Sequence, residues 1–148
     1  MDKSADRRWL RWAILFGIVY LIIGLAFGEL ANLATSDEMR VVWRLAAWVV
    51  SAVAFATHIG YEHFHMHSMP RLTALHASLG AAIGAFGLAG AANVHLWLSG
   101  QGNQLLLALA LVLWPIITAV PAFLVALVLA AVLTRIRRSG GTGNPGRS

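Results

Sequence analysis

The sequence predicts an all-α integral membrane protein in which four helices form an antiparallel bundle. Three observations predict this class. Of the 148 residues, 59% are hydrophobic and only 11% are charged, whereas an ordinary soluble domain is about 25% charged. The hydrophobic residues gather in four stretches, each long enough to cross a bilayer as a helix of about 20 residues. Short polar links with turn residues separate the stretches, and such links join antiparallel neighbours.

The four predicted helices and a tail divide the chain. The helices occupy, in order, residues 10–33, 41–66, 72–98 and 104–134. These crossings place residues 1–138 in a single transmembrane domain and leave no room for a second, soluble one. Gly and Ser dominate residues 139–148, which predicts a disordered tail.

Three of the stretches carry features of their own. The first follows a basic segment, but its apolar run exceeds the 7–15 residues typical of a signal peptide, so we expect a retained helix. The third is rich in Gly and Ala and contains Gly80-x-x-x-Gly84, which predicts a central helix that its neighbours approach closely. The fourth contains Pro115 and Pro121, which predict a kink near residues 111–121 because each proline removes a backbone donor.

The distribution of charge predicts the orientation. Most of the eleven Lys and Arg residues lie in the two terminal segments, while the side opposite the termini carries only Arg40 and Arg44. Cytoplasmic loops carry the excess of cations, so both termini are expected in the cytoplasm. The Ala/Gly-rich composition favours a bacterial inner membrane. The cations are assigned to lipid head groups and not to nucleic acid, because no basic-aromatic binding motif accompanies them.

Glu29, Arg44 and His95 form one predicted polar cluster, which lies at the outer ends of the first three helices. One interpretation is an ion pair between Glu29 and Arg44 that fixes the register of two neighbouring helices. The other is binding of a proton or a cation by Glu29, with His95 nearby. Both interpretations follow from the high free energy of an isolated charge in a bilayer.

A second predicted cluster is rich in histidine, because five of the six histidines lie between residues 58 and 76. On a helix, His58, Glu62 and His65 share one face, and the following helix returns His76 to a similar depth. These four residues could bind a transition metal, and the pair His58 and His76 could ligate a haem axially. The alternative is a set of solvated histidines at a helix end, where amphipathic side chains are common.

The sequence leaves three functions open. The first is a non-catalytic subunit or assembly factor that acts through helix–helix contacts with other membrane subunits or with copies of itself. The second is a redox protein whose histidine cluster holds haem or a metal ion. The third is a small proton-coupled transporter that uses Glu29. The chain lacks a Gly-x-Ser-x-Gly motif, a phosphate-binding loop and cysteine. The sequence therefore favours a protein without catalytic activity.

Overall fold

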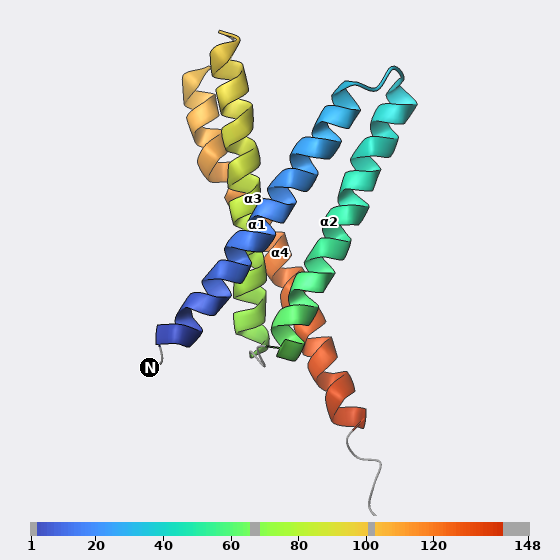
Figure 1. Ribbon diagram of the computed structural model, residues 1–148, viewed down its shortest axis with the longest axis vertical. Helices are drawn as coiled ribbons and strands as arrows, with labels where there is room; N and C mark the ends of the chain where they lie inside the picture. Colours follow the sequence, from blue (N-terminus) through green and yellow to red (C-terminus); the bar gives the residue numbers. More distant parts are fainter. Residues whose placement is uncertain (1–2, 66–68, 101–102, 141–148) are drawn as a thin grey trace, which may run out of the picture.

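The computed structural model describes residues 3–65, 69–100 and 103–140, and these residues are almost entirely helical. The helices are α1 (Lys3–Asn32), α2 (Asp37–His65), α3 (Pro70–Leu98) and α4 (Gln104–Gly140) (Figure 1). Each helix is long and apolar enough to cross a membrane. The predicted all-α class and the four helices are therefore confirmed, and the chain is a small membrane protein with four candidate spans.

The helix bounds differ from the predicted ones mainly at the two ends of the chain. Helix α1 begins before residue 10, because its basic first turns continue the helix beyond the apolar stretch. Helix α4 runs to Gly140, so the first two residues of the predicted tail are helical. The rest of that tail and the predicted last residue of the second helix lie outside the described residues. Helix α4 continues through Pro115 and Pro121 without interruption, and its kink stays a prediction.

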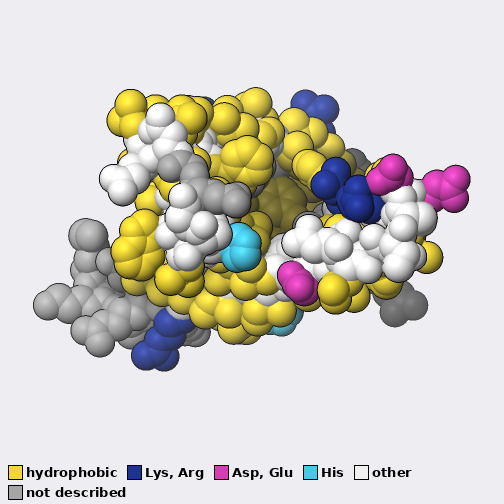
Figure 2. Space-filling view, turned by 90° about the horizontal axis from the view of Figure 1, so that it is seen from above, with side chains coloured by type: hydrophobic (Ala, Val, Ile, Leu, Met, Phe, Trp, Pro, Cys, Tyr) yellow, Lys and Arg dark blue, Asp and Glu magenta, His cyan; other side chains and the backbone are white. Residues whose placement is uncertain are grey.

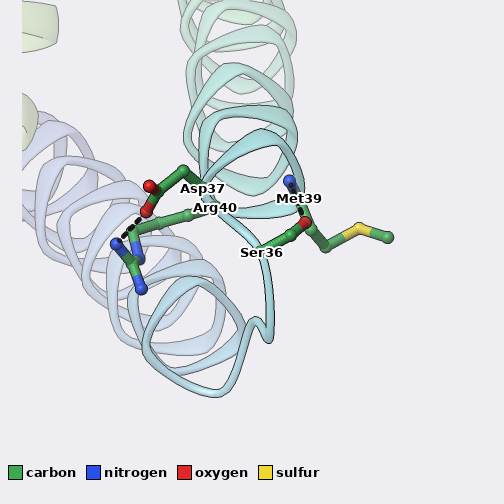
Figure 3. A network of polar contacts seen from close by, with 4 residues as sticks. All are labelled: Ser36, Asp37, Met39 and Arg40. Carbon is green, nitrogen blue, oxygen red and sulfur yellow. Dashed lines mark hydrogen bonds and ion pairs between the residues drawn. The ribbon is translucent and has the colours of Figure 1, made fainter.

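Local polar contacts fix the start of α2. The side-chain oxygen of Ser36 accepts a hydrogen bond from the backbone N–H of Met39, at 3.2 Å. In the first turn, Arg40 donates to the carboxylate of Asp37, at 2.7 Å. Figure 3 shows both contacts. Ser36 thus acts as the N-cap, and the acidic residue lies at the positive end of the helix dipole.

The other two connections also contain residues suited to ending one helix and starting another. Helix α3 begins with Pro70, and the preceding Met69 is extended, as residues before proline usually are. After α3, Gly100 adopts φ +66°, a conformation that glycine reaches without steric strain. Helix α4 then begins after Asn103, whose side-chain oxygen accepts a hydrogen bond from the N–H of Leu105 at 2.9 Å.

The chain reverses direction at each connection, which gives the molecule two distinct ends (Figure 1). We call the lower end in Figure 1, with the start of α1, the α2–α3 connection and the end of α4, the basal end. The apical end carries the α1–α2 and α3–α4 connections. Helix α3 packs most extensively, against α4 and α1 above all and more lightly against α2. The packing is therefore centred on α3, as its small residues predicted.

Glycines allow α1 and α3 to approach closely. A Cβ atom at Gly84 of α3 would lie 2.7 Å from the Cβ of Tyr20 and 3.1 Å from the backbone oxygen of Gly17. A Cβ atom at Gly17 of α1 would lie 2.8 Å from the Cβ of Ile83. Larger residues cannot occupy these positions without moving a helix, so the glycines set the separation of α1 and α3.

We expect Gly84→Ala to destabilise the protein by about 1–3 kcal/mol, because the added methyl group overpacks the contact between α1 and α3. The matched control is Gly90→Ala on the same helix, where a Cβ atom would meet nothing within 4 Å. The control should be neutral or stabilising by up to about 1 kcal/mol, since alanine favours the helix. Thermal unfolding in detergent compares the two variants; equal stability would contradict the proposed close contact.

Candidate functional site

Three chemistry-bearing side chains meet at the basal ends of α2 and α3. His58 and Glu62 are completely buried, and His76 is 9% exposed. His58 and Glu62 lie four residues apart on one face of α2, and His76 reaches them from α3. We call His58, Glu62 and His76 the basal polar centre. The predicted return of His76 to the depth of the α2 residues is thus found in the structure.

A direct contact between Glu62 and His76 links the two helices. The Nδ1 atom of His76 lies 3.1 Å from the Oε2 atom of Glu62. With a proton on Nδ1, the imidazole donates a hydrogen bond to the carboxylate, and that bond is strengthened by the charge of the carboxylate. Both side chains are buried, so water does not compete with this contact. The pair therefore joins α2 to α3 at the basal end.

Two aromatic rings of α1 cover the histidines of the basal polar centre. Trp9 stacks on His76, with 4.6 Å between ring centroids and 8° between the planes. Phe16 stacks on His58, with 4.0 Å and 9°. Trp9 and Phe16 are seven residues apart and share one face of α1. The centre therefore receives contributions from three helices, and α1 closes it on one side.

Several polar atoms in this region make no hydrogen bond with the described part of the chain. They include both ring nitrogens of His58, the Oε1 atom of Glu62 and the hydroxyl of the fully buried Thr73. Position 80 adds a close backbone contact, because a Cβ atom at Gly80 would lie 3.1 Å from Cε1 of His58. The imidazole of His58 is thus fixed by packing between Phe16 and α3, and not by hydrogen bonds.

The structure does not support the predicted metal site. His65 is exposed and stacks on Tyr61, at 4.8 Å between ring centroids, so it does not join His58, Glu62 and His76. His65 lies almost two helical turns beyond His58, at the last residue of α2. Within the described part of the chain, no group of three or more His, Cys, Asp or Glu residues is arranged to hold a metal ion.

The proposed axial ligation of haem by His58 and His76 requires a nitrogen of each ring to point at a common iron. One face of each ring is stacked on an aromatic side chain of α1, and His76 uses Nδ1 to contact Glu62. Neither contact tests the ligation of haem, which stays a prediction.

At the apical end, Glu29, Arg44 and His95 are all exposed. The predicted ion pair between Glu29 and Arg44 is not formed in the described structure, in which Arg40 pairs with Asp37. Arg44 faces a pocket whose α1 wall comprises residues 24, 27, 28, 31 and 32. Position 29 lies roughly 130° around α1 from the middle of that wall, at about 100° per residue. The two charges share a depth but point in different directions.

The pocket beside Arg44 has a volume of about 300 Å³ and lies between α1 and α2. It is lined by small, aromatic and polar residues of both helices, namely Gly24, Phe27, Gly28, Ala31, Asn32, Arg44, Ala47 and Trp48. The sequence analysis did not predict this pocket. The sequence feature that indicates it is the spacing of Gly24, Gly28 and Ala31, which places small residues on one face of α1.

The aromatic cover of the histidines was also missed by the sequence analysis. Trp9, Ala13, Phe16 and Gly17 recur at the spacing of a single helix face, and Ala13 is completely buried. That pattern could have identified the face of α1 that meets α3. It could not have shown that Trp9 and Phe16 would each stack on a histidine.

Comparisons of the chain with models of protein families, with curated proteins and with solved structures find no match.

We expect Glu62→Leu or His76→Leu alone to destabilise the protein by about 3–5 kcal/mol, because each leaves a buried polar partner without its contact. His95→Leu is the matched control, since His95 is exposed on the same helix as His76. The double variant Glu62→Leu with His76→Leu should recover much of the loss, since it leaves neither partner alone. Denaturant unfolding measures this double-mutant cycle; strictly additive losses would show that the two residues are not coupled.

Proposed function

We propose that this small membrane protein is a non-catalytic subunit or accessory factor that acts through helix–helix contacts in the bilayer. The proposal depends on the contrast between its two ends. The basal end is closed around its polar groups, whereas the apical end has charged groups that face outward.

The burial of the basal polar centre favours a structural role for it. His58 and Glu62 have no exposed surface, and aromatic rings of α1 cover the two histidines. A catalytic or ligand-binding group must reach its substrate, and the complete burial of His58 and Glu62 does not favour this. The centre therefore holds α1, α2 and α3 together as a rigid base.

Glu29 is the observation that carries the proposal. It lies within the first candidate span, Trp9–Asn32, is exposed, and forms no ion pair with Arg44. Ionisable residues within spans usually face a bundle interior or pair with a complementary group. A carboxylate that faces outward instead favours a complementary group on a neighbouring polypeptide.

The shape of the apical end offers space for such a neighbour. The hairpin of α1 and α2 separates from the hairpin of α3 and α4 towards this end (Figure 1). Figure 2 is a view onto the apical end. It shows hydrophobic side chains at the floor of a recess, with higher parts of the molecule on either side. An apolar helix of a partner could pack against these hydrophobic side chains, with charged groups at the edge of the recess.

The proposed orientation places the basal end in the cytoplasm. Arg11, Arg71 and Arg135 lie towards this end of α1, α3 and α4. Apical cations are fewer, and one of them, Arg40, is paired with Asp37. This asymmetry supports cytoplasmic termini by the preference of cytoplasmic segments for Lys and Arg.

Native mass spectrometry of the tagged full-length chain, extracted with its native lipids in polymer discs, tests the proposal. The expected particle has a mass above the 15.9 kDa of one chain, with a fixed stoichiometry of another subunit or of further copies. Glu29→Gln should reduce the assembled fraction, because it removes the charge that favours the partner. Glu38→Gln should not, since Glu38 is an exposed acid at the start of α2.

A monomeric particle for the unmodified chain would contradict the proposal. So would an assembly that Glu29→Gln and Glu38→Gln leave equally intact, because the assembly would then not depend on Glu29. Unfolding curves of both variants confirm that any loss of assembly is not a loss of folding.

A further inference from the structure

We infer that the apical pocket between α1 and α2 binds the phosphate group of an anionic membrane phospholipid, with Arg44 as its principal ligand. This inference concerns a different group from Glu29 and does not depend on the proposed function. It follows from the charge, the space and the position of the pocket.

The charge of Arg44 is not neutralised within the described chain. Arg40, one helical turn earlier, donates to Asp37 at 2.7 Å, whereas Arg44 forms no ion pair with a described carboxylate. Arg44 is exposed and lies within the candidate span Asp37–His65, seven residues from its start. This is about 10 Å along the helix axis, so its long side chain can reach the level of the lipid phosphates.

The guanidinium group suits a phosphate in particular. It is planar, always charged, and presents paired N–H donors that match two oxygens of a phosphate or carboxylate. Asn32 adds an amide at the rim of the same pocket, and an amide can donate to a third oxygen. The polar groups of the pocket therefore come from both helices.

Small residues make room for the ligand. Gly28 and Ala31 form part of the α1 wall, and a Cβ atom at Gly28 would meet nothing within 4 Å. The cavity of about 300 Å³ lies at the lower limit of ligand pockets, which span about 300–1,000 Å³. Its volume therefore suits a lipid head group and not a whole lipid.

The aromatic residues of the pocket favour a lipid over a free anion. Phe27 and Trp48 line it beside Arg44, and Trp48 is 78% exposed on the outer surface of α2. Trp48 lies one helical turn further into the candidate span than Arg44, at the level of acyl chains. A phospholipid would place its phosphate on Arg44 and its glycerol and upper acyl chains along these rings, and an anionic head group would leave no competing ammonium charge.

The test measures lipid binding to the delipidated full-length protein by native mass spectrometry, with phosphatidylglycerol and phosphatidylcholine as probes. The unmodified protein should bind one phosphatidylglycerol more tightly than phosphatidylcholine. Arg44→Gln should weaken that binding by about tenfold or more, since it removes a hydrogen-bonded charge. Arg40→Gln should leave the binding unchanged, because Arg40 is paired with Asp37 and lies outside the pocket.

A second variant removes the space and keeps the charge. Gly28→Leu places a side chain where a Cβ atom has no close neighbour, so the fold should be retained while the pocket is filled. It should weaken binding of phosphatidylglycerol as Arg44→Gln does. Equal binding by the unmodified protein and both pocket variants would overturn the inference, as would an equal loss in Arg40→Gln. Displacement of the lipid by millimolar inorganic phosphate would overturn the assignment to a lipid, because the pocket would then be a site for free anions.

Discussion

The close approach of α1 to α3 is the contact on which the rest of the structure depends. In a bilayer, lipid tails are as apolar as leucine, so helices associate through close packing and polar contacts and not through the hydrophobic effect. Gly17 and Gly84 provide that packing, because a Cβ atom at either position would overlap the other helix. The crossing then places Trp9 and Phe16 over His76 and His58. The aromatic cover of the basal polar centre is thus a consequence of backbone packing.

The polar contact between Glu62 and His76 sets the register of α2 and α3, whereas the glycines set the distance between α1 and α3. Much of the buried apolar core consists of alanine, which packs closely but distinguishes poorly between alternative registers. A buried hydrogen bond between two named side chains is satisfied in only one register. Helix α2 shares little further packing with α3, so this pair sets where the two helices meet. It also explains how the hairpins can separate at the apical end while the base stays closed.

The sequence predicted those features that depend on one helix at a time. Long apolar runs predicted all four helices, and the i, i+4 spacing placed His58 and Glu62 on one face. The position of His76 along the next helix also predicted that it lies at a similar depth to Glu62. Depth alone failed for Glu29 and Arg44, because opposite charges at one level need not face each other around their helix axes. The rotation of each helix is set by packing against its neighbours, and here the face of α1 that carries Gly17 turns towards α3.

That same rotation gives the apical end two separate surfaces. Turning Gly17 and Gly84 towards each other fixes the direction of the other residues on α1, since α1 is one continuous helix. Gly28 then lines the pocket beside Arg44, and Glu29 lies on another side of α1. A protein neighbour and a lipid head group would therefore meet different sides of α1 and would not compete. Because Glu29 and Arg44 point in different directions, they do not form an ion pair with each other. Each charge is therefore available to bind a group outside the chain.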